Sequence, residues 1–229
     1  GSITDKSWTQ SHYEGLVSAT QQLGLQLIYK ENVKEEAAGE QIYDLVQQGC
    51  QIIVATSFGF GEAMQQAAKE YPDLCFFHAT GVVGDDNLST YFGRIYQIRY
   101  LCGVVAGLQT QTNEIGYAAA FPYSEVNRGI NAFALGARAV NPNATIYVEW
   151  CNSWEEDKAL TDAVTQLIEE HDIDVLTVHS DSVAYMDLGD KRASKIIGYN
   201  KDCSKDSPGT YLTAAVWQWE AFYLPCFTE

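Results

Sequence analysis

Basic side chains and long apolar runs are scarce in this chain of 229 residues, and each shortage argues against a class of partner. Only 14 lysine and arginine residues stand against 30 aspartate and glutamate residues, which gives a net charge of −16. Basic side chains supply most of the non-specific affinity for phosphate backbones and anionic lipid, so we expect neither nucleic acid nor a membrane surface as a partner. No stretch reaches the roughly 18 consecutive apolar residues that a transmembrane helix needs.

Motifs of metal binding and catalysis are also missing. The six cysteines are scattered without a CxxC pair, and we expect them to be buried, reduced and without a chemical role. HExxH, GxSxG, a P-loop and GxGxxG are all absent. His78 and His179 each end a predicted strand, which invites a metal or acid–base role, but no further ligands stand at metal spacing. The sequence therefore predicts no metal, no cofactor and no catalytic residue.

What the sequence does contain is a repeated helix–strand pattern typical of an α/β fold. With 46% hydrophobic and 19% charged residues, the composition is that of a folded globular protein. Apolar residues at helical spacing predict helices over residues 36–48, 61–70, 126–140 and 156–170. Short apolar runs predict strands over residues 51–56, 74–79, 115–120, 145–149, 173–179, 195–199 and 211–216. Parallel strands joined by crossover helices are the economical arrangement.

The pattern divides into two similar halves. We expect residues 1–112 to form a first α/β lobe, 113–209 a second lobe, and 210–229 a return segment towards the first. Hinge positions are expected near residues 111–114 and 208–213. Ligands of open parallel sheets bind at the carboxyl ends of the strands, so two such halves predict a cleft facing those ends.

Aromatic rings and small neutral polar groups dominate the predicted strand exits. They include Ser57, Phe58, Thr80, Asn152, Trp154, Asp181 and Asn200. Ring stacking and a few convergent hydrogen bonds hold a planar heterocycle well. Each residue also has an ordinary structural interpretation, since Trp and Phe beside a strand are more often core. Asp181 is equally suited to accept a ligand N–H and to cap a helix.

Short motifs then occur together in the order seen in one protein family. They are residues 5–8, 56–60, 71–73, 78–81, 94–107, 129–133, 141–142, 152–154 and 216–219. The chain resembles the basic membrane protein (BMP) family of ABC-transporter substrate-binding lipoproteins over essentially its whole length. The resemblance implies a type I periplasmic-binding-protein fold, with two doubly wound lobes, a hinge, an interlobe cleft and capture by hinged closure.

The resemblance also indicates the ligand. Purine nucleoside receptors of this family stack the base between aromatics and hold the ribose with two aspartates and a lysine. Those three positions fall here on Thr80, Asn200 and Trp217, so all three charges are gone. Buried polar groups left unpaired cost about 1–3 kcal/mol each, and a free base therefore fits better than a nucleoside. Trp8 and Trp154 are the implied stacking pair, with Asn152, Asp181 and Asn200 as polar partners.

The expected function is thus a receptor of an ABC importer that captures an adenine-like purine base and delivers it to a permease. The alternatives are a nucleoside-binding receptor, the ligand-binding ectodomain of a sensor and, less favoured, a nucleobase-processing enzyme. The expected location is extracytoplasmic, as a periplasmic protein or a cell-surface lipoprotein whose only membrane contact is an upstream lipid anchor. The resemblance further implies a strand before Gly1 and more helix and strand after Glu229.

Overall fold

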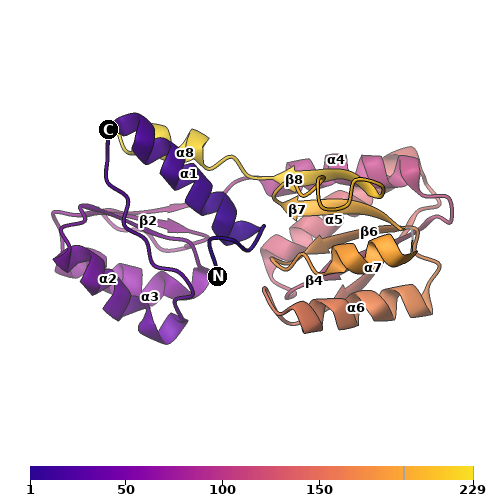
Figure 1. The fold of residues 1–229 in the computed structure, drawn as a ribbon, viewed down its shortest axis with the longest axis horizontal. Helices are drawn as coiled ribbons and strands as arrows, with labels where there is room; N and C mark the ends of the chain where they lie inside the picture. The colour runs from indigo at the N-terminus through magenta and orange to yellow at the C-terminus, as the bar shows by residue number, and fades with distance from the viewer. Residues whose placement is uncertain (193, 229) are drawn as a thin grey trace. The chain divides into compact units, whose positions relative to one another are not determined.

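The computed structural model describes residues 1–192 and 194–228, which form two compact α/β units (Figure 1). Unit 1 contains Gly1–Ile3, His12–Gly93 and the C-terminal segment from Glu220. Unit 2 contains Thr4–Ser11 and Arg94–Trp219. Ala193 and Glu229, which the expected ranges 113–209 and 210–229 include, lie outside the described residues.

Unit 1 is built on a three-stranded parallel sheet of order β1-β2-β3. Its strands are β1 (Ile52–Ala55), β2 (Cys75–Ala79) and β3 (Leu88–Tyr91). Its helices are α1 (Trp8–Leu23), α2 (Ala38–Gln47), α3 (Gly61–Glu70) and α8 (Glu220–Cys226). The first turn of α1 belongs to unit 2. Short 3₁₀ turns cover Glu35–Ala37 and Phe58–Phe60. Helices α2 and α3 cover one face of the sheet, and α8 packs on the other (Figure 1). There Phe222 stacks on Tyr91 with ring centroids 4.2 Å apart.

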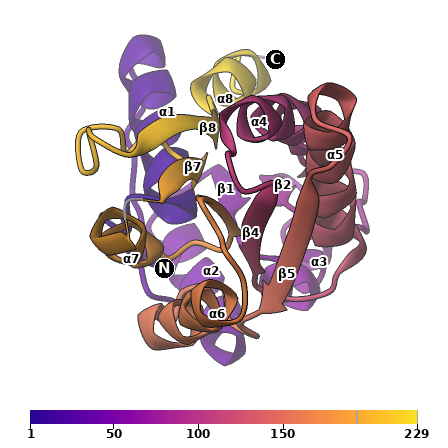
Figure 2. The ribbon, with the colours of Figure 1, turned by 90° about the vertical axis from the view of Figure 1, so that its right-hand side faces the viewer.

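Unit 2 is built on a five-stranded parallel sheet of order β5-β4-β6-β7-β8. Its strands are β4 (Glu114–Ala119), β5 (Thr145–Trp150), β6 (Val175–His179), β7 (Lys195–Asn200) and β8 (Tyr211–Val216). Its helices are α4 (Ile95–Gln109), α5 (Ser124–Val140), α6 (Asp157–Glu170) and α7 (Tyr185–Arg192). Helices α4 and α5 cover one face and α6 and α7 the other (Figure 2). Because both faces are covered, every residue of β6 is buried, as is usual for central parallel strands.

Glycines bring α4 and α5 almost into backbone contact. A Cβ added at Gly103 would lie 2.0 Å from the carbonyl oxygen of Phe133, and one at Gly136 would lie 2.0 Å from that of Tyr100. Helix α4 is therefore tied to unit 2, and the division between the units falls after Gly93 rather than after residue 112. Likewise β8 pairs with β7, so the second division falls after Trp219 rather than after residue 209.

The predicted α/β class is confirmed, and each predicted helix and strand has a counterpart within about two residues at each end. The prediction missed α1, α4, α7, α8 and β3. Strand β3 has only four residues, of which Leu88 and Tyr91 alone are buried, so it carries little apolar signal. No helix of the described residues is both long and apolar enough to cross a bilayer.

The cysteines, all of which the structure describes, are unbridged thiols. Cys102, Cys151 and Cys203 are buried, as expected. The expectation is wrong for Cys75, which is exposed at the first residue of β2, and Cys50 and Cys226 are only partly buried.

Candidate functional site

The carboxyl ends of the unit 2 strands bring together most of the site residues expected from the sequence. All neighbouring strands in this sheet are parallel, so their exits lie along one edge. Residues that follow the strands carry the rings and polar groups at this edge. In chain order they are Phe121 and Tyr123 after β4, Trp154 after β5, Ser180 and Asp181 after β6, and Trp217 after β8, with Asn200 as the last residue of β7.

Asn200 is the centre of a buried hydrogen-bond network. Its side chain is 1% exposed, and its amide nitrogen donates to Ser7 Oγ at 3.0 Å and to Asp181 Oδ1 at 2.7 Å. Its side-chain oxygen accepts from the indole N–H of Trp217 at 2.8 Å. Both N–H bonds of the amide and its oxygen are therefore engaged by protein groups.

Three indoles form a ring cluster beside Asn200. Trp217 and Trp219 are stacked with centroids 4.6 Å apart and 17° between the planes. Trp8 meets both edge-on, at centroid distances of 5.7 Å and 5.5 Å. Offset and edge-to-face ring pairs add about 0.5–1.5 kcal/mol to area burial, so the cluster is a rigid apolar platform.

The position of Trp8 is set by the cap of α1. The carboxylate of Asp5 accepts hydrogen bonds from the backbone N–H groups of Ser7, Thr9 and Gln10 at 2.8–3.0 Å. These are donors that a helix start leaves unpaired, and an acidic group there also favours the helix dipole. The hydrogen bonds of Asp5 thereby fix the backbone of the first turn of α1, which carries Trp8.

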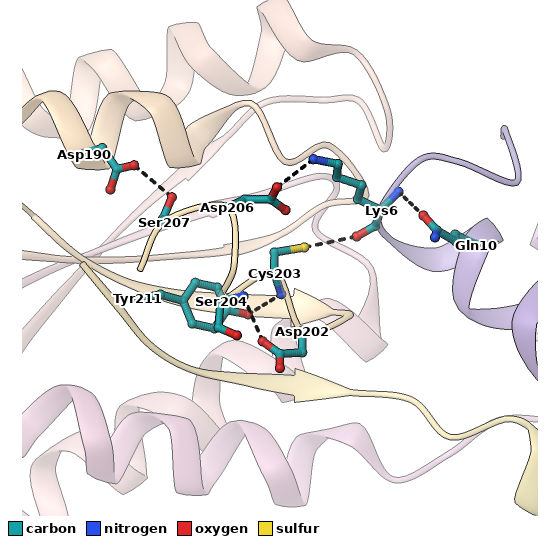
Figure 3. A network of polar contacts seen from close by, with 9 residues as sticks. All are labelled: Lys6, Gln10, Asp190, Asp202, Cys203, Ser204, Asp206, Ser207 and Tyr211. Atoms are coloured by element: carbon teal, nitrogen blue, oxygen red, sulfur yellow. Dashed lines mark hydrogen bonds and ion pairs between the residues drawn. The ribbon is translucent and has the colours of Figure 1, made fainter. Parts of the chain in front are cut away.

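A second network holds the same segment against the loop after β7 (Figure 3). Lys6 Nζ lies 3.0 Å from Asp206 Oδ1, and Cys203 Sγ lies 3.5 Å from the carbonyl oxygen of Lys6. Tyr211 on β8 accepts from the backbone N–H of Cys203 at 3.2 Å. The side chains of Lys6 and Asp206 are each about half exposed, so their ion pair adds little to the stability of the fold and serves mainly to position the two segments.

Trp154 stands in a separate group of rings at the same edge. Its centroid lies 5.8 Å from Phe121, 6.3 Å from Tyr123 and 6.4 Å from His179. Its carbonyl oxygen accepts from Ser180 Oγ at 2.6 Å and from the N–H of Asp181 at 2.7 Å. The backbone of Trp154 is therefore tied to the exit of β6, independently of its indole.

Asp181 is held in an environment that favours its neutral form. Burial of the carboxyl, and then the nearby negative charge of Asp5, raise its pKa from 3.8 to about 8, against the opposing effect of the Asn200 hydrogen bond. Asp181 does not cap a helix: the short link to α7 is organised by Ser182, whose Oγ accepts from the N–H of Ala184 at 3.2 Å. Helix α7 begins only at Tyr185, so Asp181 is not its N-cap residue.

His179 is fully enclosed at the end of β6. Its Nε2 lies 2.8 Å from the Tyr199 hydroxyl and its Nδ1 lies 3.2 Å from the Tyr117 hydroxyl. Burial lowers the pKa of the imidazole, although Glu125 opposes this effect. The residue is therefore neutral at physiological pH and has a place in the hydrogen-bond network rather than a metal-binding role. Among the described residues, no group of three His, Cys, Asp or Glu side chains is arranged to hold a metal ion.

Backbone strain marks three of the expected positions. Thr80, Asn152 and Asn200 have φ values of 64°, 53° and 68°. Positive φ is tolerated by Asn but is uncommon for a β-branched residue such as Thr. Strained backbone of this kind is concentrated at functional sites. Asn152 is exposed, and its amide donates to the Trp150 carbonyl at 3.3 Å, so it stands outside the Asn200 network.

The remaining expected residues lie in unit 1, at the ends of β1 and β2. The carbonyl oxygen of Ser57 is 2.7 Å from His78 Nε2, and the Thr80 N–H donates to the Tyr91 carbonyl at 2.9 Å. The ring of Phe58 is 61% exposed. A large exposed ring at a strand exit is free to contact a ligand, but these residues form a group of their own in unit 1.

The two α/β units with parallel sheets are those of the type I periplasmic-binding fold, whose known members include solute-binding proteins. An ABC-transporter solute-binding protein from Aeropyrum pernix matches with a TM-score of 0.87 over 100% of this chain and 67% of that chain. The sequence identity is 14%, so this likeness establishes the fold alone. The expected fold is thereby confirmed.

The family model described as ABC transporter substrate-binding protein PnrA-like (Bmp) matches residues 1–227, and the chain belongs to this family. The resemblance drawn from the short motifs is confirmed. The family is described by substrate binding rather than by catalysis, in agreement with the expectation that the chain is not an enzyme.

Two curated relatives cover nearly the whole chain. A putative ABC transporter glucose-binding protein of Haloferax volcanii is 38% identical over 97% of this chain and 57% of its own length. A purine-binding protein of Brucella abortus is 37% identical over 96% of this chain and 63% of its own length. The chain therefore spans about three fifths of the length of these relatives.

Proposed function

We propose that this chain is the ligand-binding part of an extracytoplasmic receptor of an ABC importer, and that it captures a free purine base and presents it to a permease. The single observation that carries the choice of ligand is the closed network of Asn200. Both of its amide N–H bonds are engaged by Ser7 and Asp181, and one lone pair of its oxygen is engaged by Trp217, so it offers a ribose diol no donor and a single acceptor position. A nucleoside would bury hydroxyl groups there without partners, at about 1–3 kcal/mol each.

The ring surfaces favour a flat ligand. Trp8 and Trp217 provide indole faces beside Asn200, and Trp154 provides a third with Phe121 and Tyr123 around it. Each face suits stacking with a heterocycle, and Asp181, whose pKa is raised to about 8, would offer an O–H to a ring nitrogen near neutral pH. The name of the Brucella abortus relative supports the same ligand class.

A hexose is the second candidate, because the Haloferax volcanii relative is named as a putative glucose-binding protein. Indole faces also stack on the apolar face of a sugar ring. A hexose needs several additional acceptors and donors, however, and the network of Asn200 leaves few of them in unit 2. The purine base is therefore preferred.

A lipid anchor upstream of the chain is also proposed, since the family resemblance implies one.

The test is calorimetric titration of the full-length protein with adenine, hypoxanthine, guanine, adenosine and glucose, preceded by mass spectrometry of the denatured protein for retained ligand. We expect a free base to bind with the highest affinity and adenosine to bind at least tenfold more weakly, a difference of about 1.4 kcal/mol. Preference for adenosine or for glucose would overturn the choice of ligand. Chemical conversion of a bound base on incubation would overturn the receptor function.

A further inference from the structure

Arg99 on α4 is a fully buried cation that is held by aromatic rings. The residue is 0% exposed, and its guanidinium carbon lies 4.8 Å from the ring centroid of Tyr117. The corresponding distances to Phe133 and Tyr199 are 5.2 Å and 5.3 Å. Its Nη2 donates to Thr177 Oγ1 at 3.2 Å, whereas Nε and Nη1 have no hydrogen-bond partner among the residues that the structure describes. Cation–ring attraction is strongest away from water, so the ring faces are the main partners of this charge.

Two of these rings also hold His179 through their hydroxyl groups. The hydroxyl of Tyr199 lies 2.8 Å from His179 Nε2, and that of Tyr117 lies 3.2 Å from Nδ1. Each tyrosine therefore meets Arg99 with its ring face and His179 with its hydroxyl. A neutral imidazole has one N–H and one free nitrogen, and a hydroxyl can either donate or accept. The two tyrosines thus satisfy both nitrogens of a neutral His179.

The charged groups that face His179 come from two helices. Glu125 of α5 lies 3.2 Å from its Nε2, and Arg99 comes from α4. Burial lowers the pKa of His179 most, Glu125 opposes this effect, and the positive charge of Arg99 adds to it. Tyr117 and Tyr199, from β4 and β7, stay neutral because burial raises the pKa of each phenol. Arg99 is therefore the charge that offsets the neighbouring carboxylate.

His179 in turn lies at the strand exit that carries the proposed stacking surface. It is the last residue of β6. Ser180 and Asp181, which follow it, donate to the carbonyl oxygen of Trp154 at 2.6 Å and 2.7 Å. The ring centroids of His179 and Trp154 are 6.4 Å apart. A Cβ added at Gly129 would lie 3.0 Å from two atoms of the His179 ring, so the imidazole has little room to move on that side.

We propose that Arg99 is a positioning residue of the ligand site, whose buried charge keeps His179 uncharged and in place. The fixed imidazole then holds the strand exit to which Trp154 is attached. A protonated ring would be drawn towards Glu125 and away from its bonds to the two tyrosine hydroxyls. For ligand affinity the inference rests on the proposed function, and it adds that the protonation of His179 does not limit binding in weakly acidic solution.

The experiment follows His179 by nitrogen-15 NMR of the histidine side chains between pH 5 and pH 8, without ligand. It compares the wild type with Arg99→Met, which removes the charge and keeps a long side chain. Arg128→Met is the matched control, since Arg128 lies 5.5 Å from the ring centroid of Tyr96 but is exposed. We expect His179 to become protonated at a higher pH in Arg99→Met than in the wild type, and the control to titrate as the wild type does.

Calorimetric titration with adenine at pH 7 and pH 5.5 connects the charge to the site. Between these values the adenine affinity of Arg99→Met should fall about tenfold more than that of the wild type. A shifted titration of His179 without this loss would overturn the positioning role.

Two results of the NMR titration would overturn the inference as a whole. One is identical titration of His179 in the wild type and in Arg99→Met. The other is an imidazolium in the wild type at pH 7, a result that requires no variant to fold. Failure of the wild type to bind any base would instead refute the proposed function, and the ligand-free titration of His179 would still report on Arg99.

Discussion

The side-chain amide of Asn200, the last residue of β7, donates at 2.7 Å to the carboxyl group of Asp181, which follows the neighbouring parallel strand β6. The same amide donates to Ser7, and its oxygen accepts from Trp217. One buried side chain thus joins the start of the chain, the middle of the sheet and the Trp-rich segment after β8. Asn200 therefore both stabilises the candidate site and occupies hydrogen-bonding groups within it.

Replacement of Asn200 by Ala should destabilise the protein by about 2–4 kcal/mol, because its three partners, of which Ser7 is fully buried, lose their hydrogen bonds together. Asn152→Ala is the matched control, since Asn152 also has a positive φ but is exposed. We expect that control to cost about 1 kcal/mol, the strain of Ala in the left-handed region. Urea unfolding monitored by circular dichroism measures both; equal losses would show that the network contributes nothing beyond backbone strain.

The raised pKa of Asp181 makes a prediction about stability and pH. In the unfolded chain the carboxyl titrates near 3.8, and in the folded protein near 8. The stability associated with the neutral carboxyl is fully present below pH 4 and is lost as the pH rises to about 8. The free energy of unfolding of Asp181→Asn, which stays neutral, should therefore fall less between pH 5 and pH 9 than that of the wild type. Parallel profiles of the two proteins in urea titrations at pH 5, 7 and 9 would contradict the assignment.

Trp154→Ala should weaken binding of the purine base by at least about tenfold and leave the fold intact. The bonds from Ser180 and Asp181 reach the backbone carbonyl of Trp154, so the local chain path does not depend on the indole. Calorimetric titration with adenine measures the effect, and Trp154→Phe, which keeps a stacking ring, should retain most of the affinity. Unchanged affinity in a folded Trp154→Ala protein would remove this residue from the site.

Gly103→Ala should destabilise the protein by about 3 kcal/mol or more, because the new methyl group would lie 2.0 Å from the Phe133 carbonyl oxygen and force α4 and α5 apart. Gly39→Ala in α2 is the control: nothing lies within 4 Å of its added Cβ, and Ala is the better helix former by about 0.5–1 kcal/mol. Thermal unfolding should give opposite shifts for the two variants. A neutral Gly103→Ala would mean that the helix pair can separate at little cost.

Much of the fold was predictable because it is encoded locally. The apolar run of β6, for example, is flanked by the amphipathic helix α6, and helix followed by apolar strand is the signature of parallel α/β folds. The boundaries of the two units were not predictable in this way. Whether α4 joins one unit or the other depends on Gly103 and Gly136 meeting backbone atoms of another helix, and no periodicity within α4 reports that contact.

The candidate site likewise has a part that could be predicted from the sequence and a part that could not. The strand exits at Trp154, Asp181 and Asn200 follow from where each strand ends, and the order of short motifs indicated the family. The partners of those residues did not follow. Nothing along the sequence links Asp181 to Asn200, or His179 to Tyr199, because each of these contacts joins the ends of separate strands.

The sequence by itself determined the α/β class, the net negative charge and the positions of aromatic and neutral polar residues at the strand ends, since each depends on composition or on spacing along a few turns or strands. Only the tertiary structure decided that Ser7 and Asn200, 193 residues apart, share a hydrogen bond. It also decided that burial raises the pKa of Asp181. Such properties arise from burial and from contacts between distant segments, which form only when the chain has closed long loops, and local patterning carries no record of them.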